Sequence, residues 1–258
     1  MTDLEKKNFQ QKGFVVFKNV IKKTDLNKIK KEINLKISRK EVVKYYEKIN
    51  NKNKLRRIEK VSDNFKLSSK ILKSTKMLNL LKKLTNKKYT LFKDKLNFKY
   101  PGGSGFLPHI DGHFYWIDKN RKKQSGWYKY SNHFINLVIP LEKTTKENGC
   151  LYIANKSYTS LLGRSFKNIT KNLDKNSPNI KKKKLRNFKF KAIELDKGDI
   201  LFFDWKCAHM SKKNFSNGSR MIFYATYCFA KNSVNLRNKY YYDKKHSKTE
   251  LKYKSLQY

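Results

Sequence analysis

The sequence predicts an α+β protein whose main body is a β-sandwich or jelly roll, with N-terminal helices packed on it. Residues 1–88 carry mostly helical patterns, with apolar side chains three or four positions apart. From Tyr89 onward, short aromatic and β-branched runs are separated by clusters of glycine, proline and asparagine, which is typical of strands and turns. Helices followed by many spaced strands favour a helical layer on a mainly β core.

The N-terminal part is expected to be rich in helix. Residues 40–60 are polar and charged, and we interpret them as helix and loop on the surface. The other N-terminal elements are expected in this order: a helix over 3–12, a strand over 13–17, a lysine-rich helix over about 25–33 that Thr24-Asp25 would cap, and an amphipathic helix from Ser68 to Leu84.

The β core is expected over residues 89–230, with a polar insert at 160–188 and a C-terminal tail at 231–258. No stretch is rich enough in proline or glycine to divide domains, so we expect residues 1–258 to form a single domain. The strands expected in this core are Leu91–Tyr100, His133–Leu141, Leu151–Ala154, Lys189–Leu195, Ile200–Trp205 and Met221–Phe229.

The net charge of the 258-residue chain is +42, and lysine supplies 54 of its 62 basic residues. These lysines are spread along the whole chain, so we interpret the excess as a solvated surface shaped by genome composition. A nucleic-acid partner is the alternative that such charge permits, although the even spread does not favour it. Either way, the positive field would attract small anionic substrates.

Three further features bound the cellular setting. No run of about 18 apolar residues exists, so a membrane span is not expected. The N-terminus has no apolar signal-peptide core. Cys150, Cys207 and Cys228 are odd in number and form no CxxC pair, which indicates reduced thiols in a cytoplasmic protein.

The segment from Leu96 to Trp116 carries the main chemical signal, a His-x-Asp pair at His109 and Asp111. In a strand, side chains two apart share one face, so both would project the same way. His209 follows an apolar strand and would complete two histidines and one carboxylate. That set leaves three metal positions open, as a non-haem Fe(II) oxygenase requires.

Arg220 opens the next apolar strand, eleven residues after His209. A buried arginine needs an anionic partner because it cannot lose its charge. In this setting the natural partner is the carboxylate of a bound keto acid, held bidentately.

Several motifs together resemble the phytanoyl-CoA dioxygenase family of Fe(II)/2-oxoglutarate-dependent oxygenases. The resemblance covers residues 9–245 in separate segments, which are FQQKGFVVF, LNFKYPGGSGFLPHIDGHFYW, LVIPLEKTTKENGCLYIANKSY, KGDILFFDWKCAHMSKKNFSNGSRMIFYATY and LRNKYYYDKK. Asn155-Lys156-Ser157-Tyr158 stands where many members have Pro-Gly-Ser-His. The last segment resembles a bacterial branch that includes hydroxylases of small polar metabolites such as 2-aminoethylphosphonate.

This resemblance implies a double-stranded β-helix that hydroxylates its substrate with Fe(II), 2-oxoglutarate and O2, releasing succinate and CO2. It implies that the metal ligands are His109, Asp111 and His209. It further implies that Arg220 holds the distal carboxylate of 2-oxoglutarate, with Lys99 and Asn136 near the same site.

The substrate is expected to be a small, polar or anionic metabolite. The family takes acyl-CoA thioesters as well as small metabolites, but no motif in this sequence encodes an identifiable coenzyme A site. Side chains that flank the metal segment are candidates for the substrate pocket, and they are His113, Tyr115, Trp116 and Trp127. Ordinary aromatic packing is the other interpretation of the same residues.

Three other functions remain open from the sequence. A zinc hydrolase would use His113 as a third ligand beside His109 and Asp111. A nucleic-acid demethylase of the same superfamily would suit the charge, although the second arginine typical of such enzymes is replaced by Thr226. A basic binding protein that has lost turnover is the third. The oligomeric state is not indicated.

Overall fold

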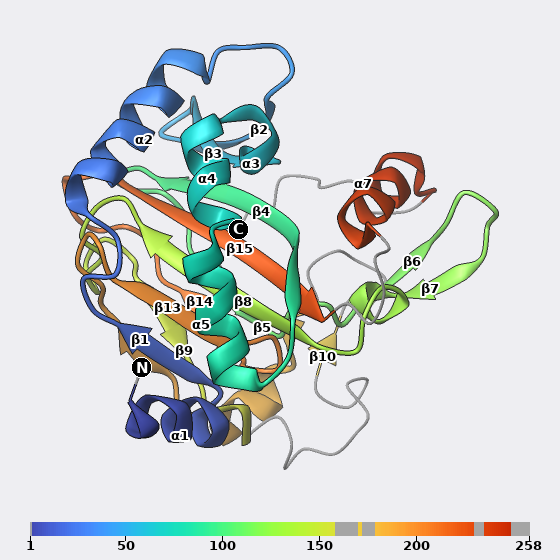
Figure 1. Ribbon diagram of the computed structural model, residues 1–258. Coiled ribbons are helices and arrows are strands. Elements are labelled where there is room, and N and C mark those ends of the chain that lie inside the picture. Colours follow the sequence, from blue (N-terminus) through green and yellow to red (C-terminus); the bar gives the residue numbers. More distant parts are fainter. Residues whose placement is uncertain (1, 158–169, 172–178, 230–234, 249–258) are drawn as a thin grey trace.

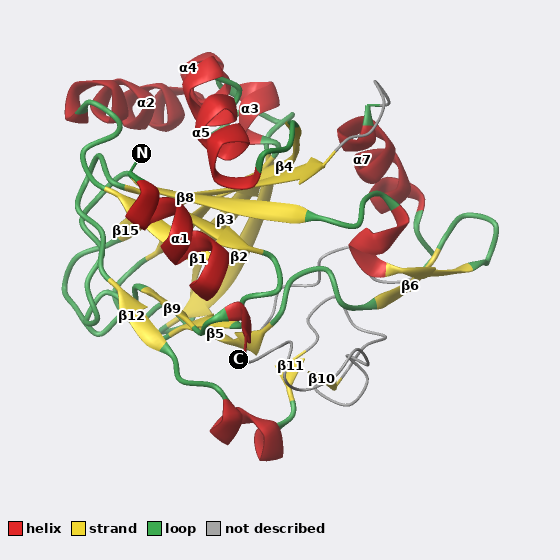
Figure 2. Ribbon diagram, turned by 60° about the horizontal axis from the view of Figure 1, so that its bottom comes forward, coloured by secondary structure: helices red, strands yellow, loops and turns green. Residues whose placement is uncertain are grey.

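Two antiparallel sheets pack face to face, and most of the helices cover the outer face of the larger one (Figures 1 and 2). This arrangement comes from a computed structural model, which describes residues 2–157, 170–171, 179–229 and 235–248. The helices are α1 (Asp3–Lys12), α2 (Lys23–Lys36), α3 (Val61–Asn64), α4 (Lys66–Leu72), α5 (Thr75–Thr85), α7 (Leu236–His246) and the 3-10 turns η1 (Gly126–Lys129) and η3 (Lys182–Asn187).

The larger sheet has the strand order β1-β13-β8-β15-β4-β3-β2 and the smaller one β10-β11-β5-β14-β9-β12. A separate hairpin, β6-β7, projects from one end (Figure 1). The larger sheet contains β1 (Phe14–Phe17), β2 (Val43–Ile49), β3 (Lys52–Glu59), β4 (Tyr89–Lys99), β8 (Phe134–Pro140), β13 (Ile200–Asp204) and β15 (Arg220–Phe229). The others are β5 (Phe106–His109), β6 (Tyr115–Ile117), β7 (Lys123–Ser125), β9 (Leu151–Ile153), β10 (Thr170–Lys171), β11 (Asn179–Ile180), β12 (Lys191–Ile193) and β14 (His209–Ser211).

Alternation along the central strands separates the helix-facing core from the space between the sheets. On β15, Phe223 and Tyr227 join the core that the helices cover, with Leu81 of α5 among its members. Tyr224 and Thr226 face the other way, into a cavity. Because side chains alternate in a strand, one apolar face anchors the helices while the other is available for polar chemistry. The predicted jelly roll with helices packed on it is confirmed.

The expectation for residues 40–60 was wrong. They form the hairpin β2-β3, which extends the larger sheet beyond β4. Asn50 and Asn51 both have positive φ, 49° and 61°, as the two central residues of a type I′ turn require. The Asn-Asn pair was the available signal, but the many charged residues around it concealed the strands.

Two helix boundaries also differ from the expectation. The predicted helix from Ser68 to Leu84 is broken into α4 and α5, because Ser74 caps a new helix by accepting from the Met77 N–H. The helix expected from Asp25 begins at Lys23 instead, so Thr24 lies in its first turn. The predicted C-terminal tail contains α7.

The predicted polar insert at 160–188 lies partly outside the described residues. Its described end supplies β11, which pairs with β5, and η3, which carries the lysine run. Within the described ranges, none of the helices combines the length and apolar content needed to cross a bilayer.

Candidate active site

The two histidines of the predicted metal set lie opposite each other on neighbouring strands. His109 ends β5, His209 begins β14, and they are direct cross-strand partners with ring centroids 4.2 Å apart. Asp111 follows in the turn after β5, with its Oδ2 3.8 Å from Nε2 of His209. One ligand atom from each residue falls within 4.8 Å of the others. The predicted triad is therefore present as a cluster that can hold one ion.

Backbone carbonyl oxygens fix the orientation of both imidazoles. Nδ1–H of His109 donates to the Leu107 carbonyl oxygen at 2.7 Å, and Nδ1–H of His209 donates to that of Cys207 at 3.0 Å. A carbonyl oxygen only accepts, so each Nδ1 carries the proton and each Nε2 keeps its lone pair. This is the usual outer arrangement around metal-binding histidines.

The charge states near neutral pH also suit a metal. Burial lowers the pKa of His109 to about 3, with a further contribution from the neighbouring His209, whose own pKa burial also lowers. Burial alone would raise the pKa of Asp111, but the histidines and two nearby lysines outweigh it and lower the pKa to about 2. Neutral imidazoles and an ionised carboxylate are the forms that bind metal ions.

Asn136 of β8 holds the carboxylate ligand in place. Its Nδ2 donates to Asp111 Oδ2 at 2.9 Å, and its Oδ1 accepts from the Thr226 hydroxyl at 2.7 Å. This buried chain leaves Asp111 little rotational freedom. Two imidazole nitrogens and one carboxylate oxygen, with the cavity on their open side, fit a six-coordinate Fe(II) that needs free positions.

Arg220 and Lys99, predicted near 2-oxoglutarate, are adjacent partners on β15 and β4. Arg220 is buried. Its Nε donates to the Asn148 carbonyl oxygen at 3.0 Å, and its Nη2 donates to the Gly149 carbonyl oxygen at 2.5 Å. It also hydrogen-bonds to Tyr224, which lines the cavity. The Lys99 ammonium donates to Ser211 Oγ at 2.9 Å and to the Lys212 carbonyl oxygen at 2.5 Å. Burial and the neighbouring Arg220 hold the pKa of Lys99 well below its usual value.

Of the four predicted substrate-side residues, Trp127 is the one that lines the cavity. His113 is stacked on Trp205, with ring centroids 4.9 Å apart and planes 19° from parallel. Trp116 is 1% exposed in an aromatic cluster, and Tyr115 lies on the projecting β6 under Lys123. His113 stands apart from the clustered metal ligands, so the described residues do not form the His-x-Asp-x-His site of the zinc-hydrolase alternative.

The cavity beside the triad has a charged wall that sequence reasoning missed. The strongly charged side chains on this wall are Arg57 and Glu59 of β3, Lys93 and Lys95 of β4, and Lys244 of α7. Tyr240 and Tyr241 of α7 line it as well. The available signal was two lysines with i, i+2 spacing inside a strand predicted to belong to the core. We had interpreted them with the other lysines as surface charge.

Comparisons with known proteins identify relatives in sequence and in fold. The sequence model of the family described as phytanoyl-CoA dioxygenase (PhyH) matches residues 9–222. Dioxygenase lolE1 of Epichloe uncinata is 29% identical over 197 residues, which are 76% of this chain and 68% of that protein.

Two further relatives act on phosphonates, according to their names. The methylphosphonate hydroxylase of Gimesia maris is 30% identical over 157 residues, 61% of this chain and 52% of that protein. The 2-aminoethylphosphonate dioxygenase of an uncultured bacterium (HF130_AEPn_1) is 29% identical over 172 residues, 66% of this chain and 58% of that protein. The alignments thus span little more than half the length of either phosphonate enzyme.

Solved structures show the same fold. The α-ketoglutarate-dependent carbocyclase SnoK from nogalamycin biosynthesis superposes with a TM-score of 0.69 at 14% identity, covering 89% of this chain and 85% of that one. EctD from S. alaskensis, solved with 2-oxoglutarate and 5-hydroxyectoine, gives 0.67 at 13% identity, covering 90% and 77%. At such identities the superpositions establish the double-stranded β-helix alone.

Proposed function

Since this chain belongs to the phytanoyl-CoA dioxygenase family and is a 2-oxoglutarate-dependent non-haem iron dioxygenase, we propose that it hydroxylates a small anionic metabolite. The observation that carries the proposal is the cavity that contains both the metal triad and a cluster of basic side chains. An apolar acyl chain would leave those charges without compensation, whereas a small anion would pair with them.

We assign the distal carboxylate of 2-oxoglutarate to Arg220. Its two carbonyl contacts orient the guanidinium and leave donors for a carboxylate. The buried Lys99 beside it adds positive charge at the same end of the sheet. Asn136, which was also predicted near the co-substrate, is assigned here to orienting Asp111.

When bound, iron and 2-oxoglutarate would supply the oxidising chemistry, using O2 and releasing succinate and CO2. The protein's part is to position and to exclude water. His109, Asp111 and His209 hold the metal on one wall, and the network through Asn136 fixes the carboxylate. Apolar rings such as Phe203 and Trp127 line other parts of the cavity and limit the access of water to the reacting atoms.

A phosphonate related to methylphosphonate or 2-aminoethylphosphonate is the first candidate substrate. The named activities of two relatives support this choice, together with the basic wall of the cavity. The partial coverage of those relatives makes the substrate a proposal for this chain.

The experiment begins with an anaerobic titration of the protein with Fe(II) and 2-oxoglutarate, followed through the metal-to-ligand charge-transfer band. We expect the band in the wild type, and its loss in Asp111→Ala and Arg220→Ala. Succinate formation under air is then measured with each phosphonate and with an uncharged analogue of similar size. A band without any phosphonate-dependent succinate would contradict the proposed substrate class while leaving the cofactor assignment intact.

A further inference from the structure

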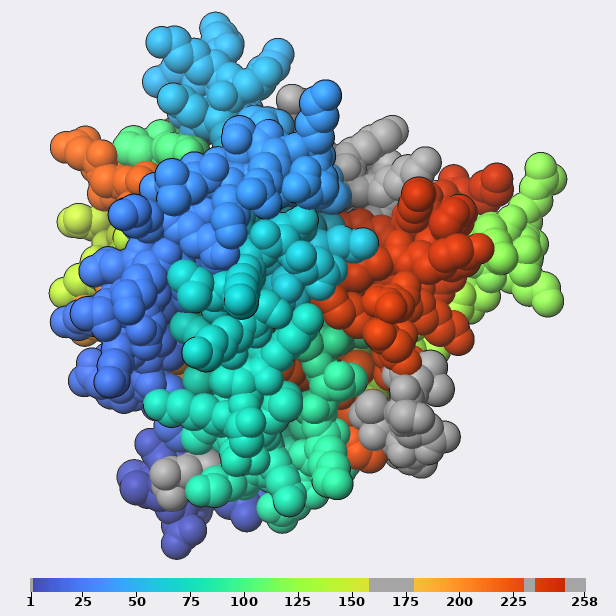
Figure 3. All heavy atoms as spheres, turned by 45° about the horizontal axis from the view of Figure 1, so that its top comes forward, coloured from blue at the N-terminus to red at the C-terminus, as the bar shows by residue number. Residues whose placement is uncertain are grey.

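The basic side chains of the cavity come from three separate elements. Arg57 lies on β3, Lys93 and Lys95 lie on β4, and Lys244 lies on α7. Figure 3 shows α7 in red, packed between the N-terminal helices and the β6-β7 hairpin, so a C-terminal segment closes this side of the site. Four cationic side chains therefore line one cavity.

One carboxylate in this group is already neutralised. Glu59 forms ion pairs with Lys244 and with Arg57, the latter at 3.5 Å. Burial would raise the pKa of Glu59, but these two cations lower it to about 2. The direct ion pairs of Glu59 are therefore with β3 and α7, and it acts on the lysines of β4 only from a longer distance.

Lys93 and Lys95 form no ion pair of this kind, although the charges of Asp111 and Glu59 act on both from a longer distance. Among the described residues, no hydrogen-bond acceptor or carboxylate lies within bonding distance of either ammonium nitrogen. Their nearest recorded neighbours are aromatic faces, Trp127 at 4.0 Å from Lys93 Nζ and Tyr224 at 5.4 Å from Lys95 Nζ. Burial lowers the pKa of Lys93 to about 7, with a further contribution from Lys95, and lowers the pKa of Lys95 to about 8, with a further contribution from Arg57; Asp111 and Glu59 oppose both shifts. Two lysine side chains thus line the cavity without a direct hydrogen bond or ion pair to the described residues.

Strand register places this pair close to the metal. Lys93 pairs with Thr226 across β4 and β15, and Lys95 pairs with Tyr224. Thr226 donates to Asn136, which in turn donates to Asp111. Lys93 is therefore one strand away from the network that holds the metal ligand. Both lysines and the three metal ligands line the same cavity.

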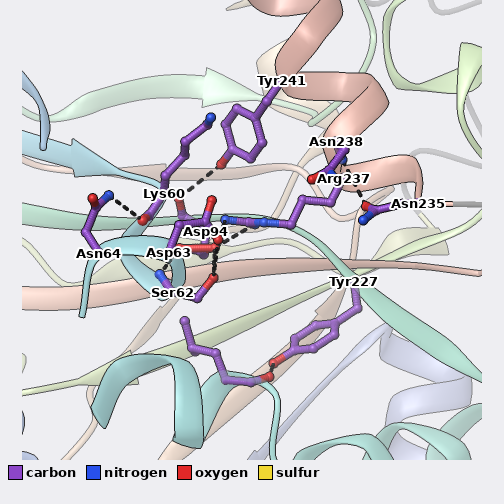
Figure 4. A network of polar contacts seen from close by, with 11 residues as sticks. Lys60, Ser62, Asp63, Asn64, Asp94, Tyr227, Asn235, Arg237, Asn238 and Tyr241 are labelled. Atoms are coloured by element: carbon purple, nitrogen blue, oxygen red, sulfur yellow. Dashed lines mark hydrogen bonds and ion pairs between the residues drawn. The ribbon is translucent and has the colours of Figure 1, made fainter. Parts of the chain in front are cut away.

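The helix that covers the lysines is itself firmly attached. Arg237 of α7 contacts Asp94 at 2.7 Å and Asp63 at 3.0 Å, and Asp94 also accepts from the Ser62 hydroxyl and main-chain N–H (Figure 4). This anchorage holds Tyr240, Tyr241 and Lys244 of α7 in the cavity wall. The fold thus holds this part of the positively charged cavity wall in place.

We propose that Lys93 and Lys95 together bind the doubly charged oxyanion group of the substrate, a phosphonate or a phosphate monoester, and orient its carbon end towards the metal. This inference rests on the proposed function and names the residues that select the substrate. Two residues apart on one strand face, the lysine Cα atoms are about 7 Å apart, which lets both ammonium groups reach one tetrahedral group. A single carboxylate would leave one of the two charges uncompensated.

The test measures binding of methylphosphonate by calorimetry to the anaerobic protein loaded with Fe(II) and 2-oxoglutarate. Lys93→Met and Lys95→Met should each weaken binding about 10- to 100-fold. The affinity for 2-oxoglutarate, read from the charge-transfer band, should change less than about threefold. Lys93→Arg should retain most of the binding, and Lys88→Met, an exposed lysine just before the same strand, should match the wild type. Acetate should bind far more weakly than methylphosphonate. Methyl phosphate is titrated as well, and its affinity relative to that of methylphosphonate tells whether the site takes phosphate monoesters or phosphonates.

Three results would overturn the inference: unchanged methylphosphonate binding in both variants, loss of 2-oxoglutarate affinity in its place, or acetate binding as tight as that of methylphosphonate. The same titration without iron and 2-oxoglutarate separates the two proposals. In one outcome the protein binds methylphosphonate through the lysines and yet never develops the charge-transfer band. That result would support the anion site and contradict the oxygenase function.

Discussion

Three consecutive residues of β4 show two different ways of burying charge. Asp94 points to the helix-covered side, where its fully buried carboxylate meets Arg237 and two donors of Ser62. Lys93 and Lys95, its neighbours on either side, point into the cavity, where the described residues offer their ammonium groups no hydrogen-bonding partner. The same strand therefore carries one charge in direct ion pairs and hydrogen bonds and two charges without such partners.

The difference separates structural from functional charge. Asp94 joins β4 to α3 through Ser62 and to α7 through Arg237, so it contributes to the fold itself. Lys93 and Lys95 are partly buried, and a cation without a direct partner in such a place lowers stability. In the proposed anion site, a bound ligand would complete the charge balance.

The largest effect is expected on the cavity side, at the metal. Asp111→Ala should reduce Fe(II) affinity and turnover by more than about 100-fold, since changes to outer partners alone cost 10- to 100-fold. Stability of the metal-free protein should change little. Fe(II) titration and heat unfolding measure the two quantities. A variant that binds iron normally would show that the triad is not the metal site.

On the helix-covered side the loss should appear in stability. Asp94→Ala leaves Arg237 buried with only the half-exposed Asp63 and should lower the free energy of unfolding by about 3–5 kcal/mol. Urea unfolding measures it. As a control, Asp196→Ala removes the exposed pair with Lys143 and should cost no more than about 1 kcal/mol. Equal losses in both variants would remove the structural role given to Asp94.

Asn136→Ala tests the network between the two regions. Without the amide, Asp111 loses its orienting donor, and iron affinity or turnover should fall about 10- to 100-fold. Thr226→Val removes only the next hydrogen bond and should have a smaller effect. The charge-transfer band and succinate formation give both values. The reverse order of the two effects would contradict the proposed chain of contacts.

The smallest expected effect is a pH-dependent gain in stability. The charge of Lys93 faces Lys95 and Lys244 as well as Asp111 and Glu59, and its pKa falls from 10.5 to about 7 on folding. Below pH 7 Lys93 is charged in both the folded and the unfolded protein, so the burial of its charge lowers the free energy of unfolding by the full amount. Between pH 7 and 10.5 the unfolded chain binds more protons, and the cost disappears as the pH rises. Lys93→Met should therefore raise the melting temperature at pH 6.5 more than at pH 9.5.

Lys88→Met is the control for this measurement, because Lys88 is exposed. Methylphosphonate should raise the melting temperature of the wild type and not that of Lys93→Met. A pH-independent gain in Lys93→Met would mean that packing, and not charge, limits stability at this position.

Much of the fold and the metal set was predictable because local patterns encode them. Apolar runs such as Ile200–Asp204 form central strands, and His109, Asp111 and His209 are residue types that the chemistry demands. The β2-β3 hairpin was missed because its strands carry more charged than apolar residues.

The basic wall of the cavity depends on long-range structure. In the β4-β15 pairing, Leu91 and Lys93 have partners while Phe92 between them has none. In a regular strand Leu91 and Lys93 would share a face, but this bulge places Leu91 on the helix side and Lys93 in the cavity. No local sequence pattern predicts that change of face. Lys244 reaches the cavity only because α7 returns to β4 from the far end of the chain.

The cross-strand pairing of His109 with His209 also sets the order in which the protein can mature. The two ligands are a hundred positions apart in the chain and approach each other only when β5 and β14 are side by side in register. During synthesis, the ribosome must therefore release the chain well beyond position 211 before an iron site exists. Metal binding then comes late, because it requires the correctly assembled smaller sheet. A chain whose synthesis stopped earlier would remain without iron.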